Sequence, residues 1–103
     1  MNEIAIAAIL RYIDGYLFEP SWNWPRQYFN RRCYERWAAS EIIDRLSDHP
    51  FDDPEQTVER FYLEMAYYSS FKEESEQNVM FAIAKETAMD ILQYLAGEIQ
   101  EDI

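Results

Sequence analysis

Apolar residues recur at helical spacing in four segments of the chain, and polar or proline-containing stretches separate these segments. In the last segment the apolar positions cover a wide face, and charged or polar residues lie opposite them. Four amphipathic segments joined by short connections predict an all-α fold, a single compact antiparallel bundle with one domain over residues 1–103. The expected helices cover residues 2–16, 25–46, 54–71 and 76–100.

Local signals place most of the helix starts. Residues 53–56, Asp-Pro-Glu-Gln, combine an N-cap acid with proline at the first helical position and a glutamine three residues after the acid. Ser75 can cap the last helix, and Asn2 is a candidate N-cap for the first. Pro25 suits the first turn of the second helix, because its missing amide has no helical partner there.

Two further signals indicate helix ends. Gly15 can adopt the left-handed conformation that closes a helix, which predicts that the first helix ends near it. Pro50 cannot continue a hydrogen-bonded turn, so the second helix should end before it.

A shared I-L-x-Y-(I/L)-x-G pattern links residues 9–15 with residues 91–97. It fits either a duplicated helix or a chance recurrence of common helix formers.

The third expected helix is apolar on two sides. Val58, Phe61 and Met65 belong to one face, whereas a second stripe lies nearly opposite. A helix of this kind is either central in the fold or presents one side to a partner. The second stripe is therefore a candidate interface, and its residues are Leu63, Tyr67 and Phe71.

The stretch from residue 22 to residue 37 is the most unusual part of the chain. It holds all three tryptophans and four of the nine basic residues. Projection at 100° per residue gives its helix a core side on which Arg32 and Arg36 also fall. Buried guanidinium groups need partners, so we expect Glu64, Asp90 or a ligand anion beside them. The other residues of this core side are Tyr28, Phe29, Cys33, Ala39, Ile42, Ile43 and Leu46.

Two interpretations of these arginines remain open. In the first, they extend along the edge of the core and reach carboxylates of the same chain. In the second, they belong to a recognition patch, because tryptophan, tyrosine and arginine dominate the energetics of protein interfaces. The residues of this candidate binding surface are Trp22, Trp24, Arg32, Tyr34, Arg36 and Trp37.

Charge divides the chain into unequal halves. The net charge is −11; residues 1–50 carry six arginines against seven acids, and residues 51–103 carry three basic residues against thirteen acids, a net of −10. Such a field attracts basic partners and repels nucleic acid and anionic membranes, although it also serves solubility. With 49% apolar residues, the chain nevertheless has enough apolar material for a folded core.

Most site chemistry is excluded by composition. Cys33 and His49 are the only cysteine and histidine, too few for a structural zinc site and a very weak signal for a catalytic pair. Only two glycines occur, so no phosphate-binding loop fits. We expect no cofactor, no metal and no catalytic residue. The single cysteine favours a cytoplasmic protein, and no apolar run approaches the roughly 20 residues that span a bilayer.

These features predict a non-enzymatic interaction or regulatory module that binds another protein or itself, with a homodimer as one form. Nucleic acid and membranes are not expected partners. The alternative is an acidic inhibitor or decoy that occupies a basic, nucleic-acid-binding site on a target. A third hypothesis is a small anion-binding helical domain or enzyme in which Arg32 and Arg36 hold an anionic ligand.

Overall fold

The protein is a bundle of four α-helices. The computed structural model describes residues 2–71 and 75–97, and within these ranges it contains no strand. This confirms the predicted all-α fold, and seven of the eight predicted helix bounds agree with the observed ones within two residues. The last helix ends at Leu95, earlier than predicted, because Ala96 and Gly97 form a turn; the predicted end at residue 100 itself lies outside the described residues. The helices are α1 (Glu3–Tyr16), α2 (Arg26–Asp48), α3 (Pro54–Ser69) and α4 (Glu76–Leu95).

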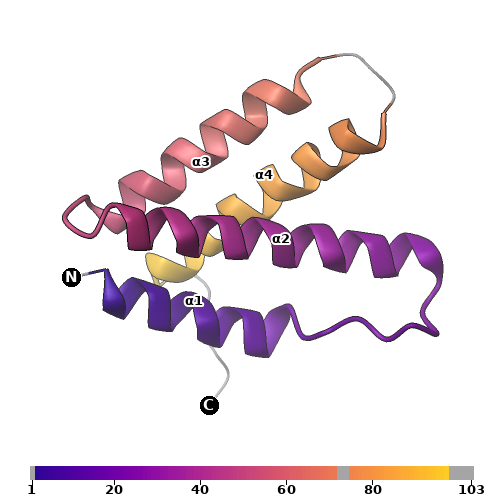
Figure 1. The fold of residues 1–103 in the computed structure, drawn as a ribbon, viewed down its shortest axis with the longest axis horizontal. Coiled ribbons are helices and arrows are strands. Elements are labelled where there is room, and N and C mark those ends of the chain that lie inside the picture. Colours follow the sequence, from indigo (N-terminus) through magenta and orange to yellow (C-terminus); the bar gives the residue numbers. More distant parts are fainter. Residues whose placement is uncertain (1, 72–74, 98–103) are drawn as a thin grey trace.

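The helices form two antiparallel hairpins, α1 with α2 and α3 with α4, and the two hairpins cross at an angle (Figure 1). α2 and α4 each contact all three of the other helices and together form the centre of the bundle. The buried face of α4 contains the small residues Ala84 and Ala88, and α2 likewise buries Ala38 and Ala39. Small side chains on both helices allow their backbones to approach closely.

All four helices contribute to one hydrophobic core. Phe61 of α3 is the largest fully buried side chain, and it is surrounded by aliphatic residues of the other helices. Within the described part of the chain, no helix is both long enough and apolar enough to cross a membrane. The largest fully buried side chains are Phe61, Ile9, Ile42, Leu46, Ile91 and Val58.

Two of the predicted helix caps are present. The carboxylate of Asp53 accepts a hydrogen bond from the backbone amide of Gln56 at 3.2 Å, and Pro54 follows it at the first helical position. The hydroxyl oxygen of Ser75 accepts one from the amide of Asn78 at 3.1 Å. Each bond satisfies an amide that has no partner within its own helix.

Two other predictions about helix termini differ from the structure in part. α1 ends at Tyr16, next to Gly15 as predicted, but Gly15 does not adopt the left-handed conformation, and the amide of Leu17 bonds to the carbonyl of Ile13 to close the helix. Among the described residues only Gly97, directly after α4, has a positive φ. Pro25 precedes the first turn of α2 and is not part of it. Its ψ of 140° is extended, so the α1–α2 connection is still extended where it enters the helix.

Asn2 also differs from its predicted role as a capping side chain. Its backbone is already helical (φ −81°, ψ −2°), whereas a capping side chain needs an extended backbone to reach the first amides. Its Nδ2 instead donates to the carbonyl oxygens of Leu46 at 3.0 Å and His49 at 2.8 Å. Asn2 thus joins the start of α1 to the end of α2, where carbonyl groups lack helical partners.

Replacing Asn2 by alanine should lower the free energy of unfolding by about 1–3 kcal/mol, since two hydrogen bonds from a buried amide are lost. Urea denaturation followed by circular dichroism measures this change. Asn23→Ala, in the exposed α1–α2 connection, is the control and should cost less. Equal stability of the wild type and Asn2→Ala would show that the tie between the two helices contributes nothing.

Candidate functional site

Arg32 and Arg36 fasten the connection between α1 and α2 onto α2. Nη1 of Arg36 donates to the carbonyl oxygen of Leu17 at 2.6 Å, and Nη1 of Arg32 donates to that of Phe18 at 2.7 Å. These carbonyls directly follow α1, where the helix leaves its last acceptors unpaired. The two guanidinium groups therefore serve as partners for the end of another helix.

Arg32 also contacts two aromatic rings and, through Nε, a carboxylate. The guanidinium carbon lies 4.5 Å from the ring centroid of Phe18 and 5.4 Å from that of Trp24, both within cation–π range. Nε lies 3.2 Å from Oε1 of Glu35. The Phe18 and Trp24 rings themselves meet edge to face, with centroids 6.1 Å apart. This arrangement agrees only in part with the first interpretation: Arg32 reaches a carboxylate of the same chain, Glu35, but the shortest bonds of both arginines go to backbone carbonyls.

The predicted partners Glu64 and Asp90 are wrong for these two arginines. Glu64 accepts from Nη1 of Arg45 at 2.8 Å, and this bond lowers the pKa of Glu64. Asp90 belongs to the α2–α4 contact, where burial and the neighbouring Glu86 raise its pKa. The error arises because the nearest acceptors are backbone carbonyls of the α1–α2 connection, and a helical projection of α2 does not include them.

Tyr34 and Trp37, two other members of the predicted binding surface, connect α2 to the second hairpin. Oη of Tyr34 donates to Oε1 of Glu76 at 2.7 Å, which raises the pKa of Tyr34. Trp37 is half-buried, and its ring centroid lies 6.4 Å from that of Phe61 in the core. Both side chains have packing roles within the bundle.

Trp22 is the member of this surface that points into solvent, with 89% of its surface exposed. It forms one wall of a shallow pocket of about 320 Å³ at the start of α2. We call this hollow the Trp22 pocket, and it is lined by Trp22, Trp24, Arg26, Phe29 and Asn30. The sequence pattern did not indicate that Arg26, Phe29 and Asn30 belong to the candidate binding surface. The spacing of these three residues could have indicated it, because residues 26, 29 and 30 share one helix face beside the loop.

The outer side of α3 carries a second exposed surface, as the two-sided pattern predicted. Leu63, Tyr67 and Phe71 are 57%, 62% and 51% exposed, whereas Phe61 and Met65 on the other side are buried. The Tyr67 and Phe71 rings pack edge to face with centroids 5.2 Å apart. We call these three residues the α3 stripe; Phe71 lies just beyond the end of the helix.

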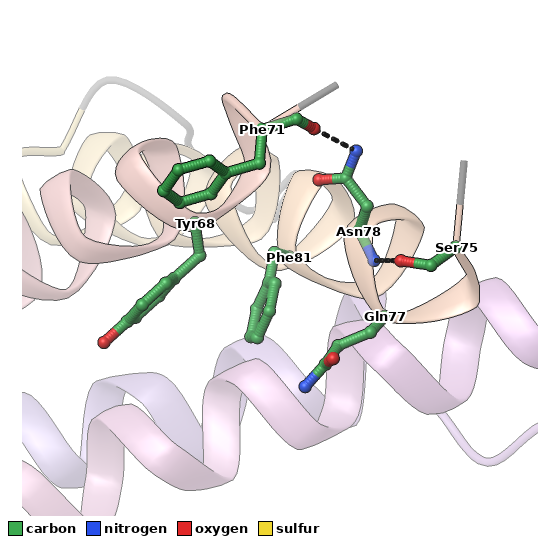
Figure 2. Close-up of a pocket in the computed structure, with 6 residues that line it drawn as sticks. All are labelled: Tyr68, Phe71, Ser75, Gln77, Asn78 and Phe81. Carbon is green, nitrogen blue, oxygen red and sulfur yellow. Dashed lines mark hydrogen bonds between the residues drawn. The ribbon is translucent and has the colours of Figure 1, made fainter. Parts of the chain in front are cut away.

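A hollow of about 270 Å³ adjoins the α3 stripe, because Phe71 belongs to both (Figure 2). Tyr68 and Phe81 extend to the same side of it, and their ring centroids are 5.2 Å apart. Nδ2 of Asn78 donates to the carbonyl oxygen of Phe71 at 3.0 Å and so links the end of α3 to α4. The full lining comprises Tyr68, Phe71, Ser75, Gln77, Asn78 and Phe81.

Side chains that could bind a metal ion do not gather in the described part of the chain. No group of three or more histidine, cysteine, aspartate or glutamate side chains comes together there in a way that could hold a metal ion. Cys33 lies in α2 and His49 at its end, so their separation of 16 positions corresponds to about 24 Å of helix. The weak sequence signal for a cysteine–histidine pair therefore has no geometric basis.

A salt-bridge network connects α2 with α4. Nη2 of Arg31 lies 2.6 Å from Oε2 of Glu86, and Nε of Arg31 lies 3.9 Å from Oε2 of Glu35. Glu35 therefore bridges Arg31 and Arg32 along one helix. These salt bridges give Arg31 and Arg32, in the first half of α2, carboxylate partners within the chain.

Comparison of the chain with protein families, curated proteins and solved structures finds no match. By its fold and its exposed side chains, the protein is an all-α bundle with two exposed aromatic surfaces, the Trp22 pocket and the α3 stripe. Function therefore has to be argued from these surfaces.

Proposed function

We propose that this protein is a non-enzymatic interaction module that binds another protein, or a second copy of itself, through the α3 stripe. The observation that carries the proposal is the exposure of Leu63, Tyr67 and Phe71 at intervals of four residues, opposite a face that is buried in the core. Apolar anchors repeated along one face are a common means by which helices recognise protein partners. Exposed aromatic side chains of this size contribute strongly to interface energetics.

The charge of the chain narrows the choice of partner. With a net charge of −11, a protein partner with a basic rim around an apolar groove is favoured over nucleic acid or an anionic membrane. A homodimer through the α3 stripe has to overcome repulsion between two acidic chains. We also place the protein in the cytoplasm, because a single cysteine gives no intramolecular disulfide.

An acidic inhibitor or decoy is the second candidate function. The net charge of −10 over residues 51–103 favours it, since such a segment can occupy a basic site on a nucleic-acid-binding target. Part of this charge is neutralised by arginines of the first half of the chain, because Glu64 pairs with Arg45 and Glu86 with Arg31. Binding of this kind would weaken steeply as salt is added, whereas binding through the α3 stripe would change much less.

The third hypothesis, an anion held by Arg32 and Arg36, has less support. Both guanidinium groups already bond to the carbonyl oxygens of Leu17 and Phe18. A ligand anion would have to share each guanidinium group with its carbonyl partner or displace that bond.

Replacing Leu63 by aspartate should weaken partner binding at least about tenfold, because it removes one of the three apolar anchors of the α3 stripe and puts a charge in its place. Leu10→Asp is the matched control, since Leu10 is a leucine on another helix with a similar exposure of 50%. Pull-down with quantitative mass spectrometry identifies proteins that the wild type and the control retain and Leu63→Asp loses. Light scattering tests self-association as a mass above 12.4 kDa.

Circular dichroism checks that both variants keep the helical fold. If Leu63→Asp retains every partner and the same solution mass as the wild type, the α3 stripe is not the contact surface. Loss of the same partner by both variants would also count against it, since Leu10 lies outside the stripe.

A further inference from the structure

We propose that the Trp22 pocket is a separate binding site for an acidic peptide segment of a partner protein, anchored by one large apolar or aromatic side chain. The pocket is formed by Trp22, Trp24, Arg26, Phe29 and Asn30. It includes neither of the fastening arginines, Arg32 and Arg36, although it lies beside the loop that they hold.

The wall of the pocket is already ordered before a ligand binds. Trp24 packs edge to face against Phe18, and the guanidinium of Arg32 lies 5.4 Å from the Trp24 ring. The amide of Trp24 also donates to the carbonyl oxygen of Ser21 at 3.0 Å. A preorganised wall reduces the entropy cost of binding.

Trp22 contrasts with this fixed wall. Its side chain is 89% exposed, even though tryptophan is among the residues that gain most from burial. Folding of this chain therefore leaves a large apolar ring unburied beside a preformed hollow. An anchor side chain seated against Trp22, Trp24 and Phe29 would remove all three rings from water together.

Charge identifies the rest of the ligand. No acidic side chain lines the pocket, and Arg26 makes no ion pair with any residue in the described part of the chain. Arg31 and Arg32, further along α2, are paired with Glu86 and Glu35, so Arg26 is the arginine beside the pocket whose charge is not compensated by a described carboxylate. Arg26 thus makes the pocket a locally basic end of an acidic protein, which favours a carboxylate beside the anchor.

The size of the pocket and the charge of the whole chain favour a peptide over nucleic acid. A volume of about 320 Å³ is at the small end of ligand pockets and suits one side chain. A nucleic acid strand would extend beyond the locally basic end, and a net charge of −11 would repel its other phosphates. A short acidic segment keeps its charge within reach of Arg26.

Selection from a library of random 12-residue peptides on the immobilised full chain tests this proposal. We expect enrichment of peptides that carry one aromatic or large aliphatic residue flanked by aspartate or glutamate. A selected peptide is then synthesised with a fluorophore, and its affinity is measured by anisotropy. Trp22→Ala and Arg26→Glu should each weaken binding at least about tenfold.

Each variant has a matched control. Phe51→Ala removes an aromatic side chain that is 84% exposed in the α2–α3 connection, far along the chain from the pocket. Arg11→Glu makes the same charge change on the exposed surface of α1. Both controls should bind the peptide with the affinity of the wild type, and circular dichroism should show the same helicity for all four variants.

Several outcomes would overturn the proposal: no enriched peptide, enrichment of basic peptides, equal affinity for Arg26→Glu and the wild type, or tighter binding of a 12-nucleotide oligothymidylate than of any peptide. Binding at the Trp22 pocket and binding at the α3 stripe both require a protein partner, but they use different surfaces. Leu63→Asp separates the two, because it removes the α3 stripe and should leave peptide binding at the Trp22 pocket unchanged.

Discussion

Replacing Phe61 by alanine is expected to lower the free energy of unfolding by about 3–5 kcal/mol, since it empties the largest fully buried position in the core. The ring also supports neighbours on two sides, because Trp37 packs 6.4 Å from it and the guanidinium of Arg45 lies 4.7 Å from its centroid. A domain of this kind has a total stability of about 5–15 kcal/mol, so a large part would be lost. Urea denaturation followed by circular dichroism measures the change.

Leu63→Ala is the matched control for this experiment, because Leu63 lies on the same helix but is more than half exposed. Its cost should be below about 1 kcal/mol, as for surface substitutions in general. Similar losses for both variants would mean that Phe61 and Leu63 do not differ in burial, and the arrangement of the core described above would then be wrong.

The double variant Arg32→Ala/Arg36→Ala is expected to lose about 2–4 kcal/mol of stability, because two charge-assisted hydrogen bonds and one stacked guanidinium disappear. The amides of the α1–α2 connection should also exchange faster with solvent hydrogen, since these bonds fasten the carbonyls of Leu17 and Phe18 to α2. Hydrogen exchange followed by mass spectrometry reports on the connection, and urea denaturation reports on global stability.

Arg11→Ala/Arg26→Ala is the control for charge, since both arginines are exposed and the double change removes the same two positive charges. It should leave stability nearly unchanged. If Arg32→Ala/Arg36→Ala instead keeps full stability and normal exchange but loses a partner, the arginines are a recognition site, and the structural interpretation is wrong.

The sequence was sufficient to predict the number of helices, their order and most of their bounds, because the determining signals are local. Asp53 and Ser75 cap helices through amides three residues away, and proline at residue 54 adds a backbone preference of its own. The two faces of α3 were also predictable, since helical periodicity alone separates Phe61 from Leu63.

Contacts between distant segments were not predictable in the same way. Arg32 and Arg36 bond to carbonyls 14 and 19 residues away, and Asn2 bonds to carbonyls 44 and 47 residues away. Backbone carbonyls are present at every position, so no residue type marks them as partners. Tyr28 was assigned to the core side of its helix, yet it is exposed, because a helical projection does not show where the bundle ends.

The candidate site was predictable only in part, for a related reason. Trp22 and the α3 stripe were identified because large apolar residues without an obvious core position are unusual. Arg26, Phe29 and Asn30 were missed, since each has an ordinary place on an amphipathic helix. Their significance depends on the path of the preceding loop, which Arg32 and Arg36 determine.

The hydrogen bonds of Asn2, Arg32 and Arg36 together determine the register of α1 against α2. Asn2 bonds at the C-terminal end of α2, while the carbonyls that follow α1 bond to Arg32 and Arg36 nearer its N-terminal end. Sliding α1 by one helical turn, about 5.4 Å, would break directional bonds at both ends at once. Apolar packing alone tolerates such slippage more readily. The first hairpin therefore behaves as one rigid unit, and the opening of the Trp22 pocket is determined by this register.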